Sequence, residues 1–448
     1  MLTKIYRILS GSDKRIQRSS YMWNTISGIS VAAQSVLILM VIMRTTGAND
    51  AGIFTIAFAT ANIISTAGKY GVRSYQVTDS ADEYTFSDYT TFRLITCVLI
   101  LLAGIIYIGV EVGSGEYSPA KGAITLVLCT QKLIDALEDV IHGLYQKKGR
   151  LDISGRSLFL RIIASTIVLI AVMIITGNLL FSAIVSTFVA LGIFIVFTVA
   201  SLPHFAALSI HIEFKTMIKL FAACFPLFVC SISNLYIYNA PKYAIDAYLS
   251  ESLQAYYGFL SMPIFVIVLL NNFVFQPILA KLAVDLSKRE YKTVMTMIRR
   301  QSIILLGISA VCILAGAAVG IPVLSFLFNA SLNGYRTDLI ILLFGGLMFA
   351  VSALSATLLT VIRFQKSLTW CYGIVSISAF FLCPFMVSHY GLRGASYAYT
   401  IIATLLAILL LGCFILRFRS EMNRNNVSDI DEKHNIMIDK TPKMQEDP

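Results

Sequence analysis

Uninterrupted apolar runs of about twenty residues recur along this chain, and no other feature limits its fold as strongly. The stretches 302–321 and 394–416, for example, contain no charged residue. A helix of about twenty apolar residues crosses the hydrocarbon core of a bilayer, whereas the strands of a membrane barrel alternate in segments of about ten. Only 13% of the 448 residues are charged, against about 25% in soluble domains. The sequence therefore predicts an all-α integral membrane protein.

Twelve such runs predict about twelve transmembrane helices, with both ends of the chain on one side of the membrane. We place them at about 22–43, 52–70, 92–110, 122–144, 158–176, 179–200, 217–239, 255–276, 302–321, 338–361, 369–388 and 394–416. The first run is of spanning length and has no small-residue cleavage site after it, so we expect it to remain as an anchor.

Basic residues are concentrated at alternate loops. One set of loops and ends holds Lys4, Arg7, Lys14, Arg15, Arg18, Lys69, Arg73, Arg93, Lys147, Lys148, Arg150, Arg156, Arg161, Lys215, Lys219, Lys281, Lys288, Arg289, Lys292, Arg299, Arg300, Arg363, Lys366, Arg417, Arg419, Arg424 and the tail lysines. The other set holds only Arg44, Lys121, Lys242, Arg336 and Arg393. Because cytoplasmic loops carry the excess of Lys and Arg, both termini are predicted to be cytoplasmic. This topology also accounts for the net charge of +10, so no nucleic-acid partner is expected.

The chain divides into four expected segments. Residues 1–20 form an amphipathic cytoplasmic segment, residues 21–203 and 204–419 carry six spans each, and the polar tail 420–448 is expected to be disordered. Within the second half, 279–300 is predicted to be a helix on the cytoplasmic face. No nucleotide-binding loop, GxSxG or HExxH motif and no CxxC pair occurs in the sequence, so we expect neither an enzyme nor a metal or cofactor site.

The fourth span carries the densest group of ionisable residues. Lys132, Asp135, Asp139 and His142 are spaced by three and four, which places them on one helical face, and Glu138 flanks them. With Lys132 as its one cation, this stripe is acidic. Such a stripe is not tolerated facing lipid. It fits either a wetted, salt-bridged helix end or a cavity lining, a latch or a cation-coupling site, and the sequence leaves both open.

Cations at helix ends form a second group: Arg44, Arg73, Lys132, Lys242, Arg363 and Arg393. If they converge on a central cavity, they provide the charge-assisted hydrogen bonds that a phosphate-bearing substrate requires. Each one alone also fits a charge that reaches from the membrane edge into the headgroup region.

Several stretches resemble the polysaccharide-biosynthesis or O-antigen (lipid-linked oligosaccharide) flippase family. This family belongs to the multidrug/oligosaccharidyl-lipid/polysaccharide exporter superfamily. The stretches are WNTISGI (23–29), GANDAGIFTIAFATANI (47–63), YGVRSYQVTD (70–79), FSDYTTFRLITC (86–97), QKLIDALEDVIHGLYQKKGRLD (131–152) and NAPKYAIDAYL (239–249). The resemblance extends through all twelve spans.

The resemblance implies two six-helix lobes around a central cavity that opens alternately to the two sides of the membrane. It implies a flippase of the bacterial cytoplasmic membrane. The substrate would be a polyprenyl-pyrophosphate-linked oligosaccharide used for O-antigen, capsular or other surface polysaccharide. Membrane lipids, a polysaccharide polymerase and glycosyltransferases of the pathway are the expected partners. Arg73, Lys242 and the Lys132–Asp139 stripe would be the cavity candidates.

Two alternatives remain. An H⁺- or Na⁺-coupled multidrug exporter of the same superfamily would use an acidic residue such as Asp135 or Asp139. A membrane glycosyltransferase or polymerase would need a large extracytoplasmic loop, and no loop of that length occurs between the predicted spans.

Overall fold

The computed structural model describes residues 16–79, 82–207, 209–210, 212–288, 290–362 and 364–439, and these residues contain helices and no strand. The helices are α2 (Ile16–Thr45), α3 (Ala48–Lys69), α4 (Val72–Thr78), α5 (Phe86–Gly113), α6 (Pro119–Lys147), α7 (Leu151–Thr176), α8 (Leu179–Ile193), η2 (Phe194–Val199), η3 (Leu202–His204), α9 (Phe214–Tyr248), α10 (Glu251–Ser287), α11 (Tyr291–Ala315), η4 (Gly316–Gly320), α12 (Ile321–Phe328), η5 (Asn333–Tyr335), α13 (Arg336–Val361) and α14 (Gln365–Asp439).

Polar residues between the apolar runs determine where several helices begin and end. Thr85 and Asp88 form a reciprocal capping box at the start of α5, and the side chains of Asn178 and Ser250 cap α8 and α10. These side chains accept hydrogen bonds from amides that have no partner in the first turn. Tyr70, with φ 47°, ends α3 in a left-handed conformation. The apolar runs therefore form helices, and the short polar segments between them end those helices.

The prediction of about twelve spans is confirmed. Among the described residues, nine helical segments are long and apolar enough to cross a membrane. The charged helix α6 (29 residues) and α10 (37 residues) also exceed the spanning length of about twenty residues. Gly391 (φ 59°, ψ −142°) divides α14 into two segments, which brings the number of spans to twelve.

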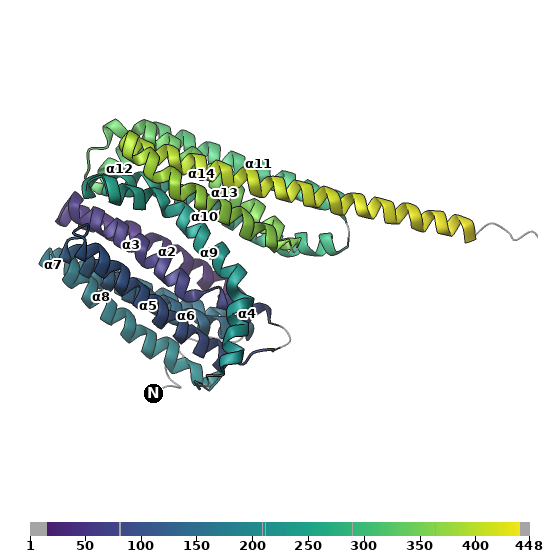
Figure 1. Cartoon of the computed structure of the whole chain (residues 1–448), viewed down its shortest axis with the longest axis horizontal. Helices are drawn as coiled ribbons and strands as arrows, with labels where there is room; N and C mark the ends of the chain where they lie inside the picture. The colour runs from purple at the N-terminus through teal and green to yellow at the C-terminus, as the bar shows by residue number, and fades with distance from the viewer. Residues whose placement is uncertain are drawn as a thin grey trace, which may run out of the picture.

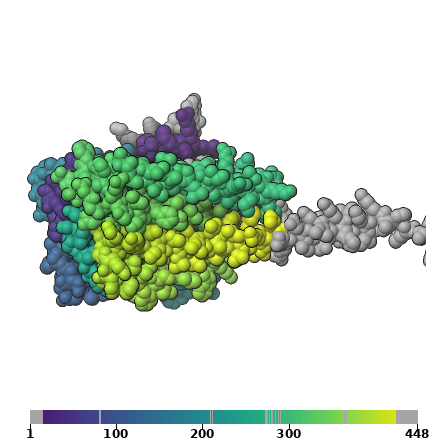
Figure 2. All heavy atoms as spheres, turned by 90° about the horizontal axis from the view of Figure 1, so that it is seen from above, coloured from purple at the N-terminus to yellow at the C-terminus, as the bar shows by residue number. Residues whose placement is uncertain are grey.

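The helices form two lobes, which lie one above the other in Figure 1. Helices α2 to α8 with η2 form the N-lobe, in which α2 packs on α7 and α3 packs on α6. Helices α9 to α14 form the C-lobe, in which α9 and α13 both pack on α14. Seen from the side of the C-lobe, α14 (yellow) lies beside the green residues of the neighbouring helices (Figure 2). This is the two-lobe architecture that the resemblance implies.

Helix α9 connects the two lobes. Its first part, including Met217, Leu220 and Cys224, is buried in a cluster with N-lobe residues. Tyr70 of the N-lobe stacks on Phe228 of α9 with ring centroids 4.4 Å apart. The second half of α9 belongs to the core that contains α13 and α14. The predicted division of the chain at residues 203 and 204 therefore precedes a helix that packs on both lobes.

Successive spanning helices run in opposite directions, so their ends define two sides of the molecule. The terminus side holds the start of α2 and the described parts of the connections, at 70–79, 82–85, 148–150, 201–207, 209–210, 212–213, 288, 290, 362 and 364. The opposite side holds the connections at 46–47, 114–118, 177–178, 249–250 and 329–335, together with Gly391.

One predicted segment is wrong. The separate surface helix expected at 279–300 does not form, because α10 continues to Ser287 and α11 begins at Tyr291. Its apolar spacing belongs instead to the ends of these two long helices.

Two other predicted segments are covered only in part. Of the predicted amphipathic segment, residues 1–15 lie outside the described residues, and 16–20 begin α2. The structure continues α14 to Asp439, and the disorder expected for 420–448 on the basis of composition stays a prediction.

Candidate functional site

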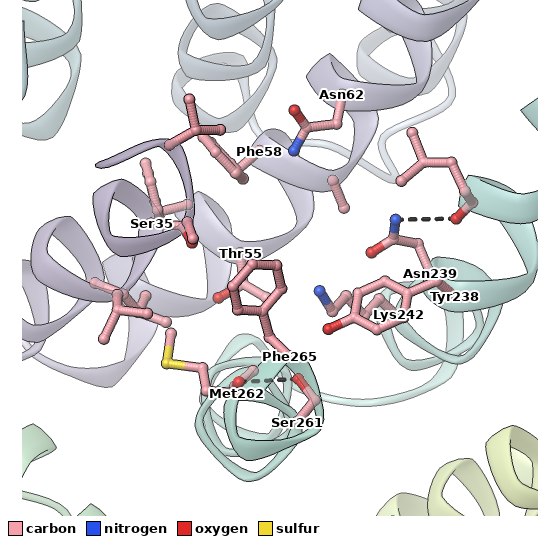
Figure 3. A pocket seen from close by; sticks show the side chains of 18 of the residues that line it. Ser35, Thr55, Phe58, Asn62, Tyr238, Asn239, Lys242, Ser261, Met262 and Phe265 are labelled. Carbon is pink, nitrogen blue, oxygen red and sulfur yellow. Dashed lines mark hydrogen bonds between the residues drawn. The ribbon is translucent and has the colours of Figure 1, made fainter. Parts of the chain in front are cut away.

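A cavity of about 290 Å³ lies between the two lobes. Four helices line it, α2 and α3 from the N-lobe and α9 and α10 from the C-lobe, and α6 contributes Lys132. The labelled lining residues in Figure 3 are Ser35, Thr55, Phe58, Asn62, Tyr238, Asn239, Lys242, Ser261, Met262 and Phe265, and their side chains surround a common space. The lining is therefore partly aromatic and partly amide and hydroxyl.

Both charged residues that line this cavity are lysines. Lys132 Nζ lies 3.1 Å from Asp135 Oδ2 and 4.7 Å from the centroid of the Phe58 ring. Lys242 Nζ lies 5.4 Å from the centroid of the Tyr238 ring. Among the described residues, no carboxylate lies within ion-pair distance of Lys242, and no Asp or Glu lines the cavity. The cavity thus presents positive charge, and one of its two lysines has no anionic partner.

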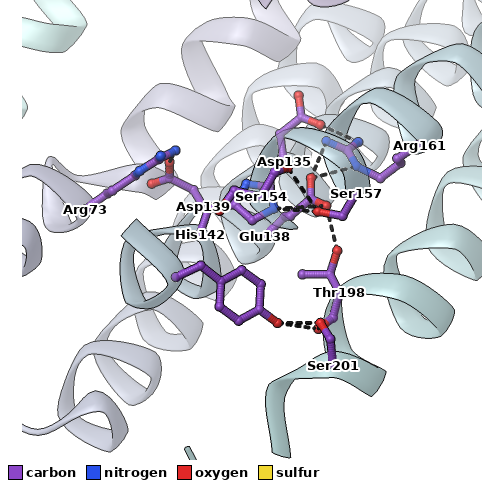
Figure 4. Close-up of polar contacts among 11 residues, drawn as sticks. Arg73, Asp135, Glu138, Asp139, His142, Ser154, Ser157, Arg161, Thr198 and Ser201 are labelled. Carbon is purple, nitrogen blue, oxygen red and sulfur yellow. Dashed lines mark hydrogen bonds and ion pairs between the residues drawn. The ribbon is translucent and has the colours of Figure 1, made fainter. Parts of the chain in front are cut away.

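The rest of the α6 stripe points into the interior of the N-lobe, where arginines from other helices meet it (Figure 4). Arg161 of α7 pairs with Asp135 at 2.6 Å, and it donates from Nε to Glu138 Oε2 at 2.9 Å. Arg93 of α5 pairs with Asp139 at 2.9 Å. We call these ion pairs, together with the contacts that Arg73, His142 and Thr198 make with the same face of α6, the α6 network.

Weaker polar contacts complete the α6 network. The Thr198 hydroxyl donates to Glu138 Oε1 at 2.8 Å, and His142 Nε2 lies 3.0 Å from Ser157 Oγ. Thr198 belongs to η2, a π-helical turn, and such turns are frequent at functional sites. Arg73 donates to Gln146 Oε1 at 2.9 Å and lies 3.4 Å from Asp139 Oδ1. The α6 network therefore joins α4, α5, α6, α7 and η2.

Burial decides between the two environments that the sequence leaves open for the stripe. The side chains of Glu138 and His142 are 1% and 3% exposed, and those of Asp135 and Asp139 are 17% and 15% exposed. A wetted helix end would expose them far more, so the stripe faces neighbouring helices. Its roles in cation coupling or as a latch stay predictions. Among the described residues, no group of His, Cys, Asp or Glu is arranged to hold a metal ion.

The sequence prediction places Arg93 and Arg161 among the basic loops and helix ends and misses their contacts with the α6 stripe. Both lie inside helices, with side chains 0% and 2% exposed. Each is the single charged residue of its stretch, TTFRLITC and LFLRIIAS, and that context was the available signal. Arg73, Arg93 and Arg161 add three cations to Lys132. The stripe therefore has four cations against its three carboxylates, so it is not the acidic site that the sequence predicts.

Of the other predicted cations, Arg44, Arg73 and Arg393 do not line the cavity. Arg44 is exposed on the opposite side, where it donates to the backbone oxygens of Phe326 and Leu327. Arg393 lies on the same side within the C-lobe, 3.7 Å from Asp338. Arg363 lies outside the described residues. Of the six predicted substrate-path residues, the structure brings Lys132 and Lys242 to the cavity.

Comparison with known proteins identifies one relative by sequence and several by fold. No family model matches the sequence. The chain is 25% identical over 405 residues to the capsular polysaccharide biosynthesis protein CapF of Staphylococcus aureus. The aligned region covers 86% of this chain and 96% of that protein.

Solved structures of similar fold cover more than nine tenths of the chain. An inward-facing multidrug resistance MATE family transporter of the MOP superfamily superposes with a TM-score of 0.60 at 14% identity, covering 94% of this chain and 98% of its own. The MATE transporter VcmN of Vibrio cholerae in its bent form gives 0.61 at 10% identity, with 93% and 99% covered. A MOP superfamily transporter from Pyrococcus furiosus, described by the reverse polarity of its binding pocket, gives 0.55 at 12% identity, with 93% and 98% covered.

At these identities the solved structures establish the fold alone, and the CapF similarity adds a sequence relative in polysaccharide biosynthesis. The resemblance predicted from the sequence is therefore confirmed, and this multi-pass membrane protein has the fold of the MOP transporter superfamily.

Proposed function

We propose that the chain is a flippase that moves polyprenyl-pyrophosphate-linked oligosaccharide repeat units across the bacterial cytoplasmic membrane by alternating access. The observation that carries this proposal is the charge of the cavity between the lobes. Lys132 and Lys242 line it, and no carboxylate does so among the described residues. An anionic head group fits such a cavity, whereas a cationic drug would meet repulsion.

The remaining lining suits the two other parts of such a head group. Ammonium groups form charge-assisted hydrogen bonds with phosphate oxygens. The aromatic rings of Phe58 and Tyr238 provide flat apolar faces for sugars, and the amides of Asn62 and Asn239 provide donors and acceptors. A sugar–pyrophosphate head does not cross hydrocarbon unaided, because burying an unpaired charge is prohibitive. The polyprenyl tail is apolar and stays in the bilayer.

The direction of transport follows from the expected topology. The basic loops would place the terminus side in the cytoplasm, where lipid-linked repeat units are expected to be loaded, and the opposite side would face the polysaccharide polymerase. The capsular polysaccharide relative supports a place in surface-polysaccharide assembly. Glycosyltransferases that build the repeat unit are the expected suppliers of the substrate.

The multidrug exporter alternative draws on the solved transporters of similar fold. It requires a carboxylate that exchanges H⁺ or Na⁺. Asp135 and Asp139 instead face Arg161 and Arg93 at 2.6 and 2.9 Å, and a guanidinium held that closely competes with a coupling ion. We therefore assign these carboxylates the role of a latch inside the N-lobe.

A transport assay tests the proposal. Purified protein in vesicles should translocate a polyprenyl-pyrophosphate oligosaccharide, and Lys242→Ala should slow this by about tenfold or more, since a hydrogen bond to a charged group contributes about 1.5–3 kcal/mol. Lys242→Arg keeps the charge and is the matched variant, which should retain most of the rate. Arg73→Ala removes a cation that does not line the cavity and should have a smaller effect than Lys242→Ala.

Two results would contradict the proposal. If Lys242→Ala transports the lipid-linked sugar as fast as the original chain, the cavity lysine is not on the substrate path. If the original chain moves no lipid-linked sugar but extrudes a cationic dye, the multidrug exporter alternative replaces the flippase.

A further inference from the structure

The two lobes are joined on the opposite side by a compact ion cluster. Lys121 in the first turn of α6 pairs with Asp246 in the last turn of α9, and its Nζ donates to Glu251 Oε1 of α10 at 2.8 Å. The Tyr117 hydroxyl donates to the second oxygen of Asp246 at 2.8 Å. One N-lobe cation thus bridges two C-lobe carboxylates.

This cluster is withdrawn from solvent. The side chain of Lys121 is 5% exposed, and those of Asp246 and Glu251 are 9% and 24% exposed. Close charge pairs of this kind couple strongly across an interface, whereas exposed pairs contribute little. The cluster therefore contributes to the closed arrangement of the lobes on this side.

The positions of two of these charges are unfavourable within their own helices. Lys121 lies at the positive end of α6, and Asp246 lies at the negative end of α9. The helix dipole favours the reverse arrangement at each end. Neither residue therefore stabilises its own helix, and the contact that compensates for both is the one between the lobes.

Two further contacts join helices on the same side. Gly52 at the start of α3 lies so close to the backbone of Glu251 that a Cβ atom at this position would overlap it. Arg44 at the end of α2 donates to the carbonyl oxygens of Phe326 at 2.8 Å and Leu327 at 3.2 Å, at the end of α12. The opposite side is therefore closed by the ion pairs of Lys121, by the close packing of Gly52 on Glu251, and by the hydrogen bonds of the Arg44 guanidinium to α12.

We propose that Lys121, Asp246, Glu251 and Arg44 form a clasp that holds the lobes closed on the opposite side, and that its release opens the cavity to that side. The clasp bridges α6 to α9 and α10, and α2 to α12. Except for α12, these helices also line the cavity. Separation of the lobes at the clasp therefore separates the walls of the cavity. This proposal depends on the fold and the contacts, and it holds whatever substrate the cavity takes.

Amide hydrogen exchange of the full chain in nanodiscs, without substrate, tests the clasp. Lys121→Glu places three carboxylates together and should speed exchange on the opposite side, at 48–52 and 250–255, by about tenfold or more. Exchange on the terminus side, at 70–78, should slow at the same time, because alternating access closes one side as it opens the other. The double variant Lys121→Glu with Glu251→Lys restores one cation between two carboxylates and should return both segments to their original rates.

A matched pair of arginines provides the control. Arg44 and Arg336 both donate to backbone oxygens on the opposite side, but Arg336 contacts Ala317 within the C-lobe. Arg44→Gln should give a smaller change of the same kind, with faster exchange at 48–52 and 250–255 and slower exchange at 70–78. Arg336→Gln should leave exchange in these segments unchanged. Faster exchange on the opposite side without slower exchange on the terminus side would show local fraying and would overturn the clasp. Unchanged exchange in Lys121→Glu, or a charge swap that folds with an unaltered melting temperature but fails to restore exchange, would also overturn it.

Discussion

The α6 network and the cavity between the lobes share α6 but treat their charges differently. In the network, Asp135, Glu138 and Asp139 each lie within 3 Å of an arginine. In the cavity, Lys132 has one carboxylate partner, and Lys242 has none among the described residues. The difference separates charges that are satisfied inside one lobe from a charge that is available to a ligand.

Removing a charge should have opposite effects on the stability of the fold in the α6 network and in the cavity. A buried charge whose partner is removed destabilises the fold, because it can neither be hydrated nor paired. A charge that has no partner already weakens the fold, and its retention calls for a purpose other than stability. We therefore expect changes in the α6 network to affect folding first and changes at Lys242 to affect binding first.

The largest effect is expected from Arg161→Ala. It leaves Glu138, which is 1% exposed, and Asp135 without the guanidinium that both share. Breaking such a buried pair should lower the free energy of unfolding by about 3–5 kcal/mol, measured by denaturation of the purified protein in mixed detergent micelles. The double variant Arg161→Met with Glu138→Gln removes both charges and should recover part of the loss. A loss below about 1 kcal/mol would mean that the network contributes little to the fold.

A smaller effect of opposite sign is expected at the cavity. Lys242→Met keeps the length of the side chain and removes an unpaired charge, so it should raise the free energy of unfolding by about 1–2 kcal/mol, a part of the roughly 2.5–3.5 kcal/mol that insertion of a charge requires. Lys132→Met is the matched variant. It removes one of the two cationic partners of Asp135, the other being Arg161, and should not stabilise the chain. Equal effects of the two variants in the same denaturation assay would remove the distinction between the lysines.

Much of the fold was predictable from the sequence, because the spanning helices depend on local apolar runs and on the caps between them. The spacing of Lys132, Asp135, Asp139 and His142 by three and four likewise places them on one face of α6, as the sequence predicts. The partners of that face were not predictable, because tertiary packing alone decides which faces of the neighbouring helices α5 and α7 turn Arg93 and Arg161 toward α6.

The site illustrates the same limit. Lys242 and Lys132 were named as cavity candidates from chemistry and resemblance, but Arg44 and Arg393 have the same residue type and the same position near a helix end. Only tertiary packing places Arg44 on α12 and Arg393 beside Asp338. A lysine at the start of α6 likewise reads as a loop charge until α9 and α10 bring Asp246 and Glu251 to it.

The smallest expected effect separates a latch from a coupling site at the edge of the α6 network. His142 Nε2 lies 3.0 Å from Ser157 Oγ and 3.5 Å from Glu138 Oε1. A double-mutant cycle of His142→Ala and Ser157→Ala should give a coupling energy of about 0.6 kcal/mol, the average for hydrogen bonds between membrane helices. In a latch, the pH dependence of transport should be the same in Ser157→Ala as in the original chain, since the hydroxyl only positions the ring. If the coupling is present and the pH profile of Ser157→Ala moves, His142 exchanges a proton during transport, and the functional region would extend from the cavity into the α6 stripe.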